Sequence, residues 1–123
     1  MAPPKEELAP RDTEKLIVIW SSADPGVAHN VCFMYTHNAK RRGWFDDVTL
    51  IVWGPSAELA SHDKAIQTRI REMITDGVVV EACKACFDSY GASDALTKLG
   101  VDVRYMGIPL TDYLKEGRRV LTF

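Results

Sequence analysis

Two cysteines three positions apart are the residues of this chain whose types and spacing most directly suggest chemistry. Cys83 and Cys86 form the segment CKAC, shortly after the apolar run VVV. Such a pair can bind a metal, close a redox disulfide, handle sulfur, or pack in the core. Cys83 stands where a predicted strand ends and a helix begins, and the free N–H groups of a helix start favour the nucleophilic thiolate. We therefore interpret Cys83 as a reactive thiol, the alternative being a small buried side chain that fills space.

Cys86 lies one helical turn after Cys83, so the two sulfurs are within reach of a disulfide. The surroundings differ from those of thioredoxin-like proteins: no Trp precedes Cys83, and Lys-Ala rather than Gly-Pro separates the two cysteines. Cys86 is accordingly a possible resolving thiol, or a residue that packs against the sheet.

A metal site is the other chemistry to consider. His29 and Cys32 are three apart near the start of a predicted helix, and with Cys83 and Cys86 they offer four zinc ligands at one edge of the predicted sheet. They point about 60° apart on a helical wheel, however, and Cys32 borders the buried arc. We expect no bound metal, and we interpret His37 and His62 as surface residues without a role.

The elements that position these residues alternate along the chain. Short apolar, β-branched runs predict strands at 16–20, 48–53, 78–82, 101–105 and 119–123. Capping residues and apolar periodicity predict helices at 25–42, from Ser56, at 63–76, 84–90 and 93–100, and at 109–117 with Thr111 as its cap. This alternation predicts an α/β fold, a three-layer α/β/α sandwich with a mainly parallel five-stranded sheet. The segments SSADPG, WGPS and CKAC then share the carboxyl edge of the sheet, where such folds place their sites.

The first helix is predicted to begin with Asp24 as N-cap and Pro25 as its first residue. At 100° per residue, one arc faces the core and contains Val27, Ala28, Val31, Met34, Tyr35 and Ala39, with Cys32 at its edge. His29, Phe33 and His37 fall on the other side. Phe33, Trp44 and Phe45 then predict an exposed apolar patch of the kind found at subunit interfaces, unless they tuck under a neighbouring helix.

Length and composition limit the class of protein. The chain has 123 residues, 46% of them hydrophobic, and a net charge of -2. We expect a flexible tail at 1–14 and a single domain at 15–123. No basic surface, membrane-length apolar run or secretory signal is evident, so we expect no nucleic acid, no membrane association and a cytoplasmic location. No G-x-G-x-x-G or P-loop follows a predicted strand, so no cofactor is expected.

The pattern from about residue 15 to 123 resembles the DsrE/DsrF-like family. The matching segments are KLIVIWSSADP, VTLIVWGPSA, MITDGVVVEAC and YMGIPLTDYLKEGRRVLTF, with Cys83 followed eight residues later by Gly91. The resemblance implies that Cys83 carries sulfur as a persulfide, received from a donor protein and passed to an acceptor protein. It also implies a homo-oligomer, a trimer or a hexamer. Cys86 departs from the family pattern, so the resemblance assigns it no role.

Three functions are compatible with these features. The first is a sulfur carrier or sulfurtransferase-like protein, which needs an exposed Cys83. The second is a non-enzymatic, oligomeric module that binds or regulates through a small ligand at the strand ends. The third is a metal site built from the cysteines and His29, which needs clustered sulfur atoms.

Overall fold

The computed structural model describes residues 14–123. The predicted tail lies almost entirely outside these residues. The described part forms a five-stranded sheet with strands β1 (Lys15–Trp20), β2 (Asp47–Val52), β3 (Val79–Cys83), β4 (Asp102–Arg104) and β5 (Arg119–Thr122). The helices are α1 (Pro25–Val27), η2 (Ala28–Phe33), α2 (Met34–Arg41), α3 (Ser56–His62), α4 (Lys64–Thr75), α5 (Lys84–Ser89), α6 (Ser93–Leu99) and α7 (Gly107–Lys115). The α/β fold predicted from the sequence is confirmed.

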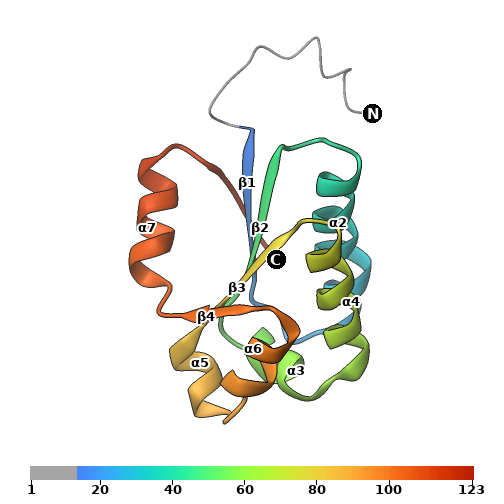
Figure 1. Cartoon of the computed structure of the whole chain (residues 1–123), viewed down its shortest axis with the longest axis vertical. Helices are drawn as coiled ribbons and strands as arrows, with labels where there is room; N and C mark the ends of the chain where they lie inside the picture. The colour runs from blue at the N-terminus through green and yellow to red at the C-terminus, as the bar shows by residue number, and fades with distance from the viewer. Residues whose placement is uncertain (1–13) are drawn as a thin grey trace.

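The strand order is β4-β3-β2-β1-β5, and every pair is parallel. The chain steps from β1 to β4 in one direction and then returns past β1 to add β5. Because parallel crossovers are right-handed, steps in one direction place their helices on one face, and the return step places its helix on the other. Figure 1 shows this arrangement: α2, α4 and α6 lie on one side of the sheet and α7 on the opposite side. The sheet is thus wholly parallel, where the sequence predicted a mainly parallel one.

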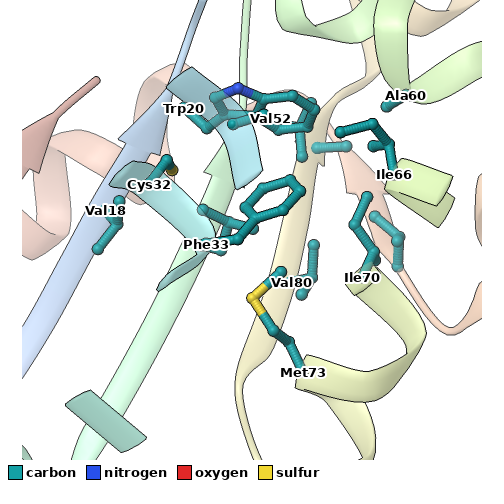
Figure 2. Close-up of a cluster of buried hydrophobic side chains, with 14 of the residues drawn as sticks. Val18, Trp20, Cys32, Phe33, Val52, Ala60, Ile66, Ile70, Met73 and Val80 are labelled. Atoms are coloured by element: carbon teal, nitrogen blue, oxygen red, sulfur yellow. The ribbon is translucent and has the colours of Figure 1, made fainter. Parts of the chain in front are cut away.

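The larger core lies between the sheet and the helices from η2 to α6. Figure 2 shows its centre, where Phe33 lies between the strands and helix α4. The rings of Trp20 and Phe33 pack edge to face with centroids 4.8 Å apart. Ile66, Ile70 and Met73 of α4 are fully buried against this centre, as their spacing predicts.

Helix starts follow the sequence in one place and depart from it in two others. Asp24 accepts hydrogen bonds from the backbone N–H groups of Gly26 (2.7 Å) and Val27 (3.2 Å), so it is the predicted N-cap. Ser56 is instead the first residue of α3, and its hydroxyl donates to the Trp20 carbonyl at 2.6 Å. Thr111 lies inside α7, which begins four residues earlier at Gly107. Both predicted caps were wrong: the hydroxyls of Ser56 and Thr111 donate to backbone carbonyls, of Trp20 and Gly107 respectively, and do not accept from an N–H at a helix start.

The first long helix corrects the helical-wheel prediction, because η2 is a π-helix with i→i+5 hydrogen bonds. The wider turn carries one more residue than an α-turn and so shifts the buried face along the sequence. Phe33, expected on the solvent side, is fully buried. Val31 and Met34, expected in the core, are 44% and 51% exposed. Cys32, expected at the edge of the arc, is completely buried.

His37 is the second correction in this helix. It was expected at the surface, but it is only 4% exposed, and its Nε2 lies 2.7 Å from the Asp76 carboxylate at the end of α4. The contact therefore joins the two long helices on this face. Thr36 beside it is also buried, as the shifted phase requires.

The predicted apolar patch is also reduced. Phe33 belongs to the core, and Phe45 packs partly buried against it. Trp44 remains 38% exposed, with its ring 5.7 Å from that of Tyr35. The alternative that some of these side chains lie under neighbouring elements is therefore correct for Phe33 and Phe45.

Candidate functional site

Cys83 and Cys86 occupy the strand-to-helix junction that the sequence predicts. Cys83 is the last residue of β3 and the N-cap of α5, and Cys86 lies in the first turn of that helix. Cys86 is half-buried, whereas Cys83 is only 6% exposed. The low exposure of Cys83 differs from the expectation for a sulfur-transfer thiol.

The two thiols form one interacting unit with a backbone group from a different loop. Burial raises the pKa of the Cys86 thiol above its usual range. The hydrogen bond between Cys86 and Cys83 and the negative charge of an ionised Cys83 raise this pKa further, whereas a hydrogen bond from the backbone of Gly54 lowers it. The thiol of Cys86 is therefore harder to ionise than an ordinary cysteine thiol.

Gly54 follows β2, so the predicted meeting of strand-end segments at the carboxyl edge is observed. It has a φ of +87°, a left-handed conformation that glycine adopts without strain. Nearby, the backbone N–H of Ser56 donates to the Ser21 carbonyl at 2.9 Å, and the Ser21 hydroxyl donates to the Phe123 carbonyl at 3.1 Å. These bonds connect the ends of β1, β2 and β5 beside the cysteine pair.

Cys83 lies in a second, smaller core on the α7 side of the sheet. It packs there with Ile17, Ile51 and Met106, which are all buried, and with partly buried side chains of Trp53, Leu110 and Tyr113. Met106, Leu110 and Tyr113 belong to the segment that crosses from β4 to β5. One wall of the Cys83 environment is therefore the sheet itself, and the other is α7 with the residue before it.

A buried carboxylate on the same strand was missed by the sequence analysis. Glu81 is two residues before Cys83, so both side chains lie on the same face of β3, and Glu81 is 2% exposed. It accepts a hydrogen bond of 2.7 Å from the Tyr113 hydroxyl and pairs with the guanidinium of Arg104. The sequence did carry a signal for this pair, a single acidic residue inside the apolar segment VVVEAC. A charge buried in a strand requires a partner of opposite charge or a hydrogen-bond donor.

The partners of Glu81 are themselves held in place. Arg104 is paired with Cys83 in the β3–β4 register, and its Nε lies 3.3 Å from the Asp102 carboxylate. Burial, together with the hydrogen bond to Glu81 and its negative charge, raises the pKa of Tyr113 to about 12. Arg118 lies over the Tyr113 ring at 4.4 Å. Tyr113 is thus a neutral donor at all physiological pH values.

The four candidate metal ligands are not brought together. Cys32 lies in the larger core, on the opposite face of the sheet from Cys83, and burial raises the pKa of the Cys32 thiol to about 12. His29 is half-buried with its ring edge-on to Phe33 at 6.0 Å. Across residues 14–123 no group of three or more His, Cys, Asp or Glu side chains is arranged to hold a metal ion.

A pocket of about 280 Å³ lies at the other end of the strands. It is formed by the starts of β2 and β3 and by the end of α7, and its lining residues are Asp47, Val48, Thr49, Gly77, Val79, Tyr113 and Arg118. The sequence had predicted a ligand cleft at the carboxyl edge, so this pocket is a different location. Tyr113 connects it to the environment of Cys83.

The fold and the site together define the class of protein. It is a wholly parallel α/β/α domain with a cysteine at the end of its third strand. The chain belongs to the DsrE/DsrF-like family, which matches residues 29–123 and so includes both Cys83 and Cys86. A conserved protein of unknown function from Bacteroides thetaiotaomicron has a similar solved structure. It is 41% identical, with a TM-score of 0.86 over 89% of this chain and 95% of that chain. No curated protein matches the chain. In the part of the chain that the structure describes, no helix is long and apolar enough to cross a membrane.

Proposed function

We propose that the protein is a sulfur carrier in which Cys83 accepts sulfane sulfur as a persulfide and passes it on. The observation that carries the proposal is the cysteine pair itself. Cys83 ends β3 and caps α5, and it shares a hydrogen bond with Cys86 in the first turn of that helix. Membership of the DsrE/DsrF-like family supports a role of the sulfur-relay type.

The chemistry needs a thiolate and no organic cofactor. The Cys83 thiolate attacks the outer sulfur of a donor persulfide, R–S–SH. A bond forms between that sulfur and Cys83, the donor S–S bond breaks, and the donor leaves as the thiolate R–S⁻. The product is Cys83–S–SH, which an acceptor thiolate attacks in the same manner. The donor and the acceptor are expected to be proteins.

Cys86 has two roles compatible with its position. As a hydrogen-bond donor it stabilises negative charge on Cys83. As a resolving thiol it attacks the inner sulfur of the persulfide, so that Cys83–S–SH and Cys86–SH give a Cys83–Cys86 disulfide and H₂S. The second role leaves an oxidised protein that a dithiol reductant must restore.

The domain organisation, location and oligomeric state of the carrier are part of the same proposal. A single domain at 15–123 in the cytoplasm, working as a homotrimer or hexamer, fits the family resemblance. Exposed apolar side chains such as Trp44 and Met34 support subunit contacts.

The test is sulfur uptake by the reduced protein. The protein is treated briefly with inorganic polysulfide, alkylated and digested with trypsin, which cuts after Lys84 and so separates Cys83 from Cys86. We expect one added sulfur atom on the Cys83 peptide, with uptake lost in Cys83→Ser and retained in Cys32→Ser. Release of sulfide by the parent but not by Cys86→Ser identifies Cys86 as the resolving thiol. Equal uptake by Cys83→Ser excludes the carrier function.

A second candidate, a small-ligand-binding module, is favoured by the low exposure of Cys83 and by the 280 Å³ pocket. It predicts ligand-dependent stabilisation that is unchanged in Cys83→Ser.

A further inference from the structure

The burial of Cys83 conflicts with any reaction at its sulfur. A sulfur atom that is attacked by, or attacks, a second molecule must be reached along the S–S axis, and Cys83 is only 6% exposed. Some of its covering residues must therefore move during each transfer. This argument rests on the proposed function.

The possible moving parts are few. Ile17 and Ile51 belong to strands β1 and β2, which are each paired with a neighbouring strand on both sides. The other side chains of this core are Trp53 after β2, Val120 of β5, Cys86 itself, and Met106, Leu110 and Tyr113 from the segment between β4 and β5, which supplies the largest share. Met106 is 1% exposed, although Tyr105 before it and Ile108 two residues later are 67% and 77% exposed. Met106 is therefore the fully buried side chain that this segment places over the site, and Leu110 and Tyr113 pack beside it.

The helix that carries this cover is weakly attached. None of the nine residues of α7 is fully buried, whereas α4 on the other face buries three. Leu114 of α7 is 56% exposed. Because little apolar surface holds α7 to the sheet, its detachment costs much less free energy than global unfolding. Figure 1 shows α7 standing apart from the helices on the other face.

A specific polar contact offsets this weak packing. Tyr113 donates 2.7 Å to the carboxylate of Glu81, which Arg104 also holds, and Glu81 is on the cysteine strand. Glycine residues lie at both ends of the helix: Gly107 is its first residue, and Gly117 follows its last turn with a φ of +78°. The chain can therefore change direction at both ends of α7 while β4 and β5 stay paired.

We propose that α7, with Met106, is a lid over Cys83 that the Tyr113–Glu81 hydrogen bond holds closed. In the closed form the thiol is protected from small oxidants and alkylating agents. In the open form, which is a minor population in the free protein, a donor sulfur reaches it. A docking partner that contacts the exposed side chains of Tyr105 or Ile108 favours the open form.

The first test compares rates of alkylation by iodoacetamide in the folded protein, read separately on the three cysteine peptides. Tyr113→Phe removes the hydroxyl but keeps the ring, so we expect Cys83 to react about tenfold faster. Cys32, buried in the other core, should change less than twofold, and Lys115→Ala on the exposed side of α7 should leave all three rates unchanged. An unchanged Cys83 rate in Tyr113→Phe overturns the lid, and so does an equal rise at Cys32, which indicates general destabilisation.

The second test uses the unaltered protein and so does not depend on the folding of a variant. Opening of a small lid exposes little surface, so the Cys83 rate should be nearly independent of urea at low concentration. The Cys32 rate, which needs global unfolding, should rise steeply. A common slope for both cysteines overturns the proposal. Since neither test uses sulfur transfer, a lid without polysulfide uptake rejects the carrier function alone, and uptake without a lid rejects this inference alone.

Discussion

The hydroxyl of Tyr113 donates a 2.7 Å hydrogen bond to Glu81, a residue 32 positions earlier that lies two places before Cys83 on β3. The same carboxylate pairs with Arg104 of β4. One buried negative charge therefore connects the cysteine strand, the edge strand beside it and the helix above it. Its position explains how β4, with only three residues, and α7, with none fully buried, are held beside Cys83 in the closed form.

Replacing Glu81 with Gln should lower the free energy of unfolding by about 2 kcal/mol. Removing one member of a fully buried pair costs about 3–5 kcal/mol, and the loss is smaller here because Arg104 is partly exposed and water can solvate it. Urea denaturation followed by circular dichroism measures the change. Asp102→Asn is the matched control, since Asp102 is the exposed partner of the same arginine and should cost less than about 1 kcal/mol. Equal losses in the two variants would show that burial of Glu81 does not matter.

The π-helical turn makes two adjacent residues respond in opposite ways to the same substitution. Phe33→Ala should cost about 3–5 kcal/mol, because Phe33 is completely buried against Trp20. Met34→Ala should change the stability by less than about 0.5 kcal/mol, since Met34 is 51% exposed. Urea denaturation of the two variants checks this. A regular α-helix with the expected buried arc requires the reverse order of losses.

These two residues also show how far the sequence determines the fold. Strand positions, the all-helical connections and the Asp24 cap were predictable because they depend on short local patterns. The phase of the first helix was not, because a π-turn inserts one residue without a sequence mark: AHNVCF reads equally well at 100° per residue. Phe33 and His37 therefore moved from the predicted surface into the interior.

The candidate site likewise has one part that the sequence predicted and another part that it did not. Cys83 and Cys86 were found because a C-x-x-C pair after a strand is visible in sequence. The contacts that give the site its character join distant segments: Tyr113 reaches Glu81, and the backbone of Gly54 reaches Cys86. The burial of Cys83 depends on where α7 lies, which follows from the return of the chain to β5. No local pattern near Cys83 contains that information.

Removal of Cys83 should move the titration of Cys86 to lower pH. Burial is the largest cause of the raised pKa of Cys86, and the hydrogen bond with Cys83 and its negative charge add to it. In Cys83→Ala the latter two effects vanish, so a larger fraction of Cys86 is thiolate at a given pH. The measurement is the rate of iodoacetamide alkylation on the Cys86 peptide across a pH series. We expect an earlier rise in Cys83→Ala and no shift in Cys32→Ala, and an unshifted profile would mean that the thiols do not interact.

Gly54 is predicted to act on Cys86 through its backbone N–H, and a second glycine provides the control. Gly54 has a φ of +87° and Gly43, at the end of α2, a φ of +68°. An alanine at either position meets the same left-handed strain, about 1–2 kcal/mol. Steric crowding adds little, because a Cβ on Gly54 meets its nearest neighbour, the Ser21 side chain, at 4.0 Å, and one on Gly43 meets nothing within 4 Å. The two variants should therefore lose similar stability in urea denaturation.

The two variants should differ in the reactivity of Cys86. The backbone of Gly54 lowers the pKa of Cys86, so a shift of that backbone away from Cys86 raises the pKa and slows alkylation at neutral pH. Gly43→Ala should leave the Cys86 rate unchanged. If both variants slow Cys86 equally, the effect comes from stability alone and the N–H of Gly54 has no specific role at the cysteine pair.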